Sequence, residues 1–179
     1  MGLAAYGEPI FYEQLSKTIF FKEGKLILDD TYYDFMRSIT RSYSDKLKSI
    51  FNIKERESNA SLDLDSSDFK SYADIAASAQ KIVEEILKKI FLFANEITGE
   101  SRFIFSGGVA MNSVAINKLA KLDFISEIII PPSPGDSGAA IGAAYYSFLQ
   151  SNPSYLKKSA KINIYEMLTP GHVNSEDHN

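Results

Sequence analysis

The chain has 179 residues, with 19 lysines and arginines against 23 aspartates and glutamates, which gives a net charge of −4. This acidic balance argues against a nucleic-acid partner, which would need a basic face or stripe. Apolar residues make up 45% of the chain, but no run of them reaches the ~18 residues of a membrane span. With no cysteine and no secretory signal, the composition excludes a disulfide framework and favours a cytoplasmic globular protein without a membrane partner.

A run of small residues, Met1–Pro9 (MGLAAYGEP), opens the chain. Such runs usually let the backbone pass close to a ligand or to another element inside a fold. We therefore expect the chain to be a fragment of a longer protein. The alternative is a mobile terminus that begins with small residues.

The next segment is predicted to hold a hairpin followed by helical structure. Residues 18–28 form two short apolar runs around Glu23-Gly24, a pair that suits a turn with positive φ. Between residues 30 and 51 the apolar residues fall at mixed spacing, which predicts one or two helices.

A polar loop and one long helix come after it. Residues 52–70 are rich in serine and aspartate, and the glycosylation pattern at Asn59 is interpreted as plain loop because no secretory signal accompanies it. From residue 71 to residue 98, apolar residues recur at the three–four spacing of one helix face. Gly99 stands where a C-terminal cap belongs.

A strand–turn–helix pattern then occurs twice. A short apolar strand at 103–105 leads through glycines into a helix at 109–122, and a second strand at 127–130 leads through a Pro-Gly turn into a helix at 137–149. This rhythm is typical of an α/β domain. The expected organisation is a hairpin and helical segment (1–51), a polar loop (52–70), an α/β lobe (71–150), and a C-terminal extension with a tail (151–179).

The first glycine turn is a candidate nucleotide site. Ligands of open α/β sheets gather at the carboxyl ends of strands. Gly107 and Gly108 would let backbone N–H groups approach an anion or a ribose, and Asn112, one turn into the next helix, could reach the same ligand. The alternative is a tight strand–helix turn with a surface asparagine.

The second turn carries Asp136, which is either the N-cap of the last helix or a carboxylate ligand for a metal. The residues 135–138 (GDSG) also match the surroundings of a serine protease nucleophile. That chemistry needs a positioned histidine, and the only histidines are His172 and His178 in the tail. The protease interpretation is therefore rejected.

Four blocks of sequence together resemble one enzyme family, the ATP-dependent O-carbamoyltransferases that modify nodulation factors and aminoglycoside or cephamycin antibiotics. The blocks occur in the same order as in that family: Met1–Pro9 (MGLAAYGEP), Tyr72–Gln80 (YADIAASAQ), Ser106–Leu119 (SGGVAMNSVAINKL) and Pro134–Gly142 (PGDSGAAIG). The resemblance covers about the whole chain.

The resemblance implies a fold and a reaction. The fold would be the C-terminal lobe of an actin-like ATPase (ribonuclease H-like) domain, similar to the tRNA threonylcarbamoyl-transfer protein. A second domain would make carbamoyl-adenylate from carbamoyl phosphate and ATP. The actin-like domain would pass the carbamoyl group to a hydroxyl of a small-molecule or oligosaccharide acceptor, beside a divalent metal, iron by resemblance.

The resemblance also implies roles for single residues. Asp136 matches the metal ligand, while Gly107, Gly108 and Asn112 match the turn that holds the adenylate; the 1–7 run matches a structural segment, and no catalytic residue is assigned. The family's His-x-x-x-His pair and its adenylate-forming domain have no counterpart here, and Ile116-Asn117 replaces an expected Asn-Gly.

We therefore expect an incomplete chain that is inactive alone. Apolar surface left open by the missing lobe could drive a homodimer. Two alternatives to this enzyme fragment are a threonylcarbamoyl-transfer-type protein and a non-catalytic nucleotide-binding module.

Overall fold

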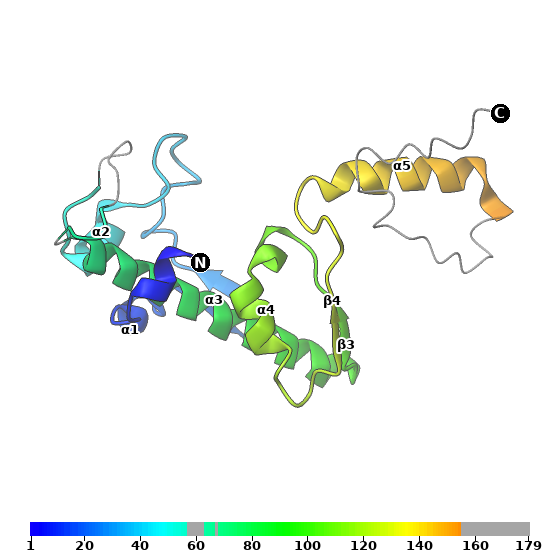
Figure 1. Ribbon diagram of the computed structural model, residues 1–179, viewed down its shortest axis with the longest axis horizontal. Coiled ribbons are helices and arrows are strands. Elements are labelled where there is room, and N and C mark those ends of the chain that lie inside the picture. Colours follow the sequence, from blue (N-terminus) through cyan, green and yellow to red (C-terminus); the bar gives the residue numbers. More distant parts are fainter. Residues whose placement is uncertain (57–62, 67, 155–179) are drawn as a thin grey trace. The chain divides into compact units, whose positions relative to one another are not determined.

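The computed structural model describes residues 1–56, 63–66 and 68–154 (Figure 1). They fall into two compact units. Unit 1 contains residues 1–101 and 112–126, and unit 2 contains residues 102–111 and the described residues from 127 onward. The pattern at Asn59, the histidines His172 and His178, and most of the predicted extension 151–179 lie outside the described residues.

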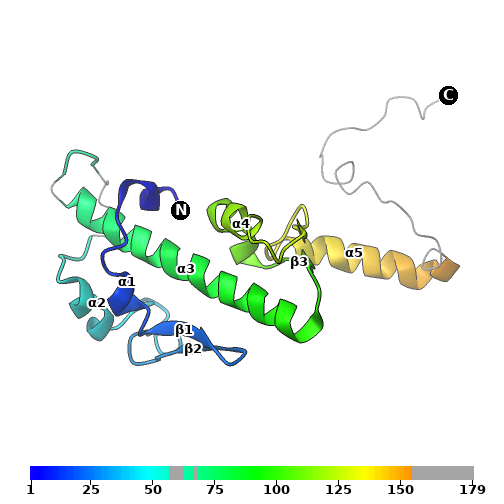
Figure 2. The ribbon, with the colours of Figure 1, turned by 90° about the horizontal axis from the view of Figure 1, so that it is seen from below.

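Unit 1 is built on the long helix α3 (Phe69–Thr98). Its apolar stripe buries Ala73, Ala77, Ile82, Leu87 and Phe91. The helix ends at Gly99, which has φ 73° and donates its N–H to the carbonyl of Asn95. The predicted helix and its glycine cap are both confirmed. Figure 2 shows the strands β1 and β2 on one side of α3 and the helix α4 on the other.

The predicted hairpin is also confirmed. Strand β1 (Ile19–Lys22) pairs antiparallel with β2 (Lys25–Leu28). The turn residues Glu23 and Gly24 have φ values of 51° and 76°, which is the backbone that a tight two-residue hairpin turn requires. Phe21 on β1 packs edge-on against Phe93 on α3, with ring centroids 5.7 Å apart, and this contact attaches the hairpin to the helix.

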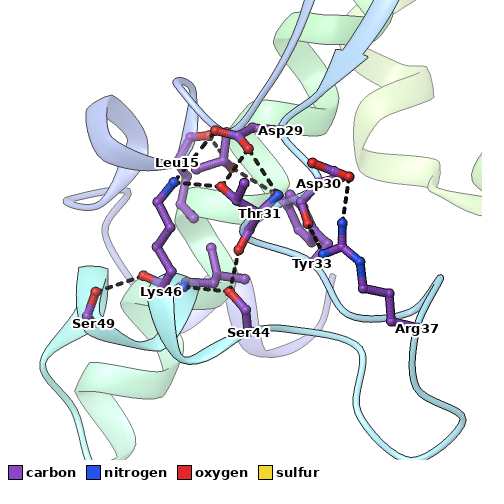
Figure 3. Close-up of polar contacts among 11 residues, drawn as sticks. Leu15, Asp29, Asp30, Thr31, Tyr33, Arg37, Ser44, Lys46 and Ser49 are labelled. Carbon is purple, nitrogen blue, oxygen red and sulfur yellow. Dashed lines mark hydrogen bonds and ion pairs between the residues drawn. The ribbon is translucent and has the colours of Figure 1, made fainter.

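The segment 30–51 is less helical than the apolar spacing predicts. Within this segment, the one helix that forms is α2 (Asp45–Phe51). A short helix, α1 (Tyr12–Leu15), lies earlier in the chain, before the hairpin. Residues 30–44 follow irregular turns, so the prediction of helix is wrong there. Side chains take over the backbone hydrogen bonds: Asp29 accepts from the Thr31 N–H, and Ser44 caps α2 (Figure 3). Such local bonds compete with helix formation.

The opening run of small residues packs against α3. It forms a 3₁₀ helix, η1 (Leu3–Tyr6), and then Gly7 approaches the α3 backbone so closely that an added Cβ would overlap the Ala73 carbonyl. The expectation that small residues let the backbone pass close to another element is confirmed, and the mobile-terminus alternative is wrong.

Unit 2 contains a small parallel sheet. Strand β3 (Arg102–Ile104) pairs with β4 (Glu127–Ile129), and the Arg102 Nε lies 2.7 Å from the Glu127 Oε2 across the pair. The turns after these strands lead into the 3₁₀ helix η2 (Gly108–Met111) and the helix α5 (Gly138–Ser151). The mixed α/β character is as expected, whereas the actin-like lobe remains a prediction.

The predicted continuous helix at 109–122 is wrong. The chain forms η2, leaves helical geometry at Asn112 (φ −80°, ψ 83°), and then forms α4 (Ser113–Leu119) in unit 1. The Asn112 side chain accepts a hydrogen bond from the Ala115 N–H at 3.1 Å. Asparagine is among the strongest N-cap residues, which is the physical reason for the break.

Candidate functional site

The two turns after β3 and β4 meet within unit 2. Because the strands are parallel, both carboxyl ends lie at one edge of the sheet. The Gly107 N–H donates to the carbonyl of Pro134 at 2.6 Å, and the Ser106 hydroxyl donates to the same oxygen at 3.1 Å. The two glycine turns that the sequence singles out are therefore joined at one carbonyl.

Gly107 and Gly108 differ in backbone conformation and in the part each can play toward a ligand. Gly107 has φ 104°, a conformation that side chains rarely adopt, and its N–H is already bonded to Pro134. Gly108 is exposed, and a Cβ at either glycine would meet no atom within 4 Å. The backbone here is thus open to a close ligand, with Gly107 shaping the turn.

Asp136 lies two residues beyond Pro134 and is exposed. The N-cap residue of α5 is Ser137, and no side chain caps that end of the helix. The Asp136 carboxylate has no hydrogen bond or ion pair among the described residues, so it is available to a cation. No group of three or more His, Cys, Asp or Glu side chains in the described ranges could hold a metal. The role of Asp136 as a metal ligand stays a prediction, and it would need further ligands.

A glycine at the start of α5 lets the Pro-Gly turn pack tightly. A Cβ on Gly138 would overlap the carbonyl oxygen of Ser133. The hydroxyls of Ser133 and Ser137 lie 2.6 Å apart across the same turn. Gly138 thus fixes the path of the backbone that carries Asp136.

Asn112 lies in unit 1, where its side-chain amide is nearly fully engaged. Its Oδ1 accepts from the Ala115 N–H at 3.1 Å and from the Gln80 Nε2 at 3.2 Å, while its Nδ2 donates to the Gln80 Oε1 at 2.9 Å. Since an amide nitrogen carries two hydrogens, one N–H remains without a partner in the described part of the chain. Asn112 can therefore offer a ligand a single donor.

The row of hydrogen-bonded polar side chains between α3 and α4 that holds Asn112 was not predicted from the sequence. Gln80 on α3 pairs with Asn112, Glu84 accepts from Gln80 at 2.9 Å, and Lys118 on α4 pairs with Glu84 at 2.5 Å. The available signal is the pair Gln80 and Glu84, which stand four residues apart and so share one helix face. The structure thus joins the two glycine turns in unit 2 and anchors Asn112 in unit 1, and a ligand role for each of these residues stays a prediction.

Comparison with known proteins identifies the family. The family model described as carbamoyltransferase N-terminus matches residues 1–145. The chain therefore belongs to the carbamoyltransferase family. The match is to the N-terminal part of that family, and it does not test the assignment to the C-terminal lobe of an actin-like domain.

Three curated relatives illustrate the match. The nodulation protein NolNO of Sinorhizobium fredii is 30% identical over 146 residues, covering 80% of this chain and 19% of the relative. The protein sll1178 of Synechocystis is 29% identical over 98% of this chain and 28% of the relative. The tRNA N6-adenosine threonylcarbamoyltransferase of Clostridium beijerinckii is 33% identical over 76% of this chain and 38% of the relative.

The chain thus spans well under half the length of these relatives. No helix among the described residues is both long and apolar enough to cross a membrane.

Proposed function

We propose that the chain is the nucleotide-binding part of an O-carbamoyltransferase. The carbamoyl group would pass from carbamoyl-adenylate, made from carbamoyl phosphate and ATP, to a hydroxyl of a small-molecule or oligosaccharide acceptor. The observation that carries the proposal is the pair of strand-end turns joined by the Gly107–Pro134 hydrogen bond, with open backbone at Gly108. Membership of the carbamoyltransferase family supports the same reaction class.

The described residues suit an anionic nucleotide. The open backbone at Gly107 and Gly108 allows a phosphate or a ribose to approach without a Cβ in the way. The positive end of the 14-residue helix α5 lies at the second turn and favours negative charge there. The remaining N–H of Asn112 can donate to an acceptor atom, which an adenylate offers on its base, ribose and phosphate.

Asp136 suits one place in the coordination sphere of a divalent metal, iron by family resemblance, because its exposed carboxylate is unpaired among the described residues. When bound, such a cation offsets negative charge that develops on the carbamoyl oxygen. In the transfer, the acceptor oxygen would bond to the carbamoyl carbon as the bond from that carbon to the phosphate oxygen of AMP breaks; AMP would leave, and the hydroxyl proton would pass to a base. No described residue is assigned as the base.

A charge-removing variant of Asp136 tests the metal role. In the intact protein, Asp136→Asn keeps the size of the side chain. We expect metal affinity to fall at least tenfold, because even the loss of a residue that only supports a metal ligand typically costs that much. Asp123→Asn, at an exposed aspartate in unit 1, is the control. Elemental analysis after dialysis measures the metal, and equal content in both variants would remove Asp136 from the metal site.

A variant of Asn112 that keeps the helix cap tests the nucleotide role. Asn112→Asp can still accept from Ala115 and Gln80 but has no N–H to donate. We expect AMP binding to weaken by about 1–3 kcal/mol. Asn117→Asp adds the same charge to an exposed position of α4. Calorimetry on the intact protein compares them, and equal affinity would limit Asn112 to capping.

Transfer of a threonylcarbamoyl group is the second candidate, favoured by the 33% identity with the Clostridium beijerinckii enzyme. The net charge of −4 weighs against a tRNA surface. Product analysis with tRNA and with hydroxyl acceptors separates the two reactions. Nucleotide binding without turnover of either would favour the third candidate, a non-catalytic nucleotide-binding module.

A further inference from the structure

Unit 1 contains a large apolar cavity that the proposed reaction does not use. The cavity has a volume of about 520 Å³ and lies between α3 and the segment that carries α2. Its walls include Ile75, Val83 and Ile86 from α3, and Leu47 and Phe51 from α2. We refer to it as the α2–α3 cavity. Small-molecule sites commonly have volumes of about 300–1,000 Å³, so this one is large enough for a ligand.

Hydrogen bonds hold the wall opposite α3 in place. Tyr33 lines the cavity, and its hydroxyl lies 2.8 Å from that of the fully buried Thr18. In the same segment, the Lys46 Nζ donates to the Thr31 hydroxyl at 2.6 Å, and the Ser44 hydroxyl donates to the Thr31 carbonyl at 2.8 Å (Figure 3). The cavity is therefore preformed, which lowers the entropic cost of binding.

The tyrosine hydroxyls around the cavity already have partners inside the protein. Tyr43 donates to the Glu55 carboxylate, Tyr72 donates to the Lys54 carbonyl at 3.0 Å, and Tyr33 is bonded to Thr18. A ligand therefore gains little from polar groups along its body. The fitting occupant is a molecule whose body is apolar, because burying it removes apolar surface from water.

The charged residues that line the cavity include one lysine that is free to meet an anion. Three cations, Lys48, Lys54 and Arg56, accompany one carboxylate, Glu55. The hydrogen bond from Lys48, followed by that from Tyr43, holds the pKa of Glu55 below its usual range. The side chain of Lys54 is exposed and has no partner within the described ranges. Because Lys48 is paired with Glu55 and Arg56 also has an interaction within the protein, Lys54 is the cation that favours an anionic end group.

We propose that the α2–α3 cavity binds an amphipathic monoanion, with its apolar body against Phe51 and Val83 and its carboxylate or similar group near Lys54. A medium-chain fatty acid has this chemistry. The site is separate from the glycine turns of unit 2, so the inference does not depend on the carbamoyl-transfer proposal.

Calorimetric titration of the intact protein with decanoate and with decanol tests both parts of the inference. The two probes share their apolar body and differ in charge. Decanoate is expected to bind about two- to fivefold more tightly than decanol, the upper part of the range that one exposed ion pair provides. Equal affinity for the two would overturn the assignment of an anion. Binding of neither would overturn the site.

Two variants locate the ligand. Ala79→Phe places a ring into the cavity and is expected to abolish binding of both probes, while Ala143→Phe, on the exposed face of α5, leaves binding unchanged. Lys54→Glu is expected to weaken decanoate about three- to tenfold and to leave decanol unchanged. The Lys54→Glu variant still tests the proposal if Ala79→Phe does not fold. Decanoate affinity unchanged in Lys54→Glu would contradict the proposed orientation.

Discussion

At the scale of single residues, two buried polar side chains on α3 anchor the start of the chain. Asp74 is 6% exposed and accepts from the Glu8 N–H at 2.7 Å, with Lys70 as its ion-pair partner. Ser78 is fully buried, accepts from the Phe11 N–H at 3.0 Å and donates to the Asp74 carbonyl at 2.7 Å. Backbone donors that would otherwise be buried without partners are thus satisfied by the helix.

Replacement of Asp74 should lower the stability of the folded chain. We expect Asp74→Ala to lower the free energy of unfolding by about 2–3 kcal/mol at neutral pH, since it removes hydrogen bonds to a charged group. Asp74→Asn keeps an acceptor for Glu8 and should cost less. Asp30→Asn, at an exposed pair with Arg37, should change little. Urea unfolding measures all three, and equal losses at Asp30 and Asp74 would contradict the anchoring role.

The same aspartate should make stability depend on pH. Burial acts to raise the Asp74 pKa, but the Glu8 N–H and Lys70 together hold it below its usual value. The folded chain therefore binds fewer protons than the unfolded chain, so this contribution is present above about pH 4 and is lost as pH falls below it. Asp74→Asn should flatten the loss in this window.

The sequence predicts the backbone positions of the candidate site residues better than the contacts that surround them. Gly107, Gly108 and Asp136 lie in the strand-end turns where the pattern predicts them, because a short apolar strand followed by glycine is a local signal. The pairing of Asn112 with Gln80 joins residues 32 positions apart. No local pattern encodes such a contact, so it could not be predicted.

At the scale of elements, the packing of η1 on α3 depends on one glycine. Gly7→Ala should destabilise the protein by about 3 kcal/mol, the upper end of typical overpacking costs, because the Ala73 backbone cannot move aside easily. Gly2→Ala is the matched control, since nothing lies within 4 Å of its Cβ position, and it should stay within about 0.5 kcal/mol. Thermal unfolding of both variants measures the difference, and similar midpoints would contradict this close packing.

The elements that could be predicted are those whose sequence patterns are local. The hairpin and α3 carry local signals, a turn pair at Glu23-Gly24 and a long apolar stripe that ends at Gly99. The segment 30–44 and the break at Asn112 are instead decided by side chains that bond to the backbone, as at Asp29. Apolar spacing does not register these competing bonds, so both helices were predicted too long.

At the scale of the whole molecule, the comparisons establish that the chain belongs to the carbamoyltransferase family and spans only part of the length of its relatives. It matches the N-terminal model of the carbamoyltransferases, yet it covers only 19–38% of the relatives described above. The joined glycine turns are the place where we propose that a nucleotide binds, and no acceptor site or group of three metal ligands is assigned among the described residues. Activity is therefore a property to be measured on the intact protein.

The most direct measurement is a transfer assay on that intact protein with carbamoyl phosphate, ATP and a panel of hydroxyl acceptors, read by mass spectrometry. We predict one AMP released for each carbamoylated acceptor, reduced turnover in Asn112→Asp and unchanged turnover in Asn117→Asp. Carbamoyl transfer that proceeds without ATP, or equal turnover in the two variants, would contradict the claim that this chain binds the reacting adenylate.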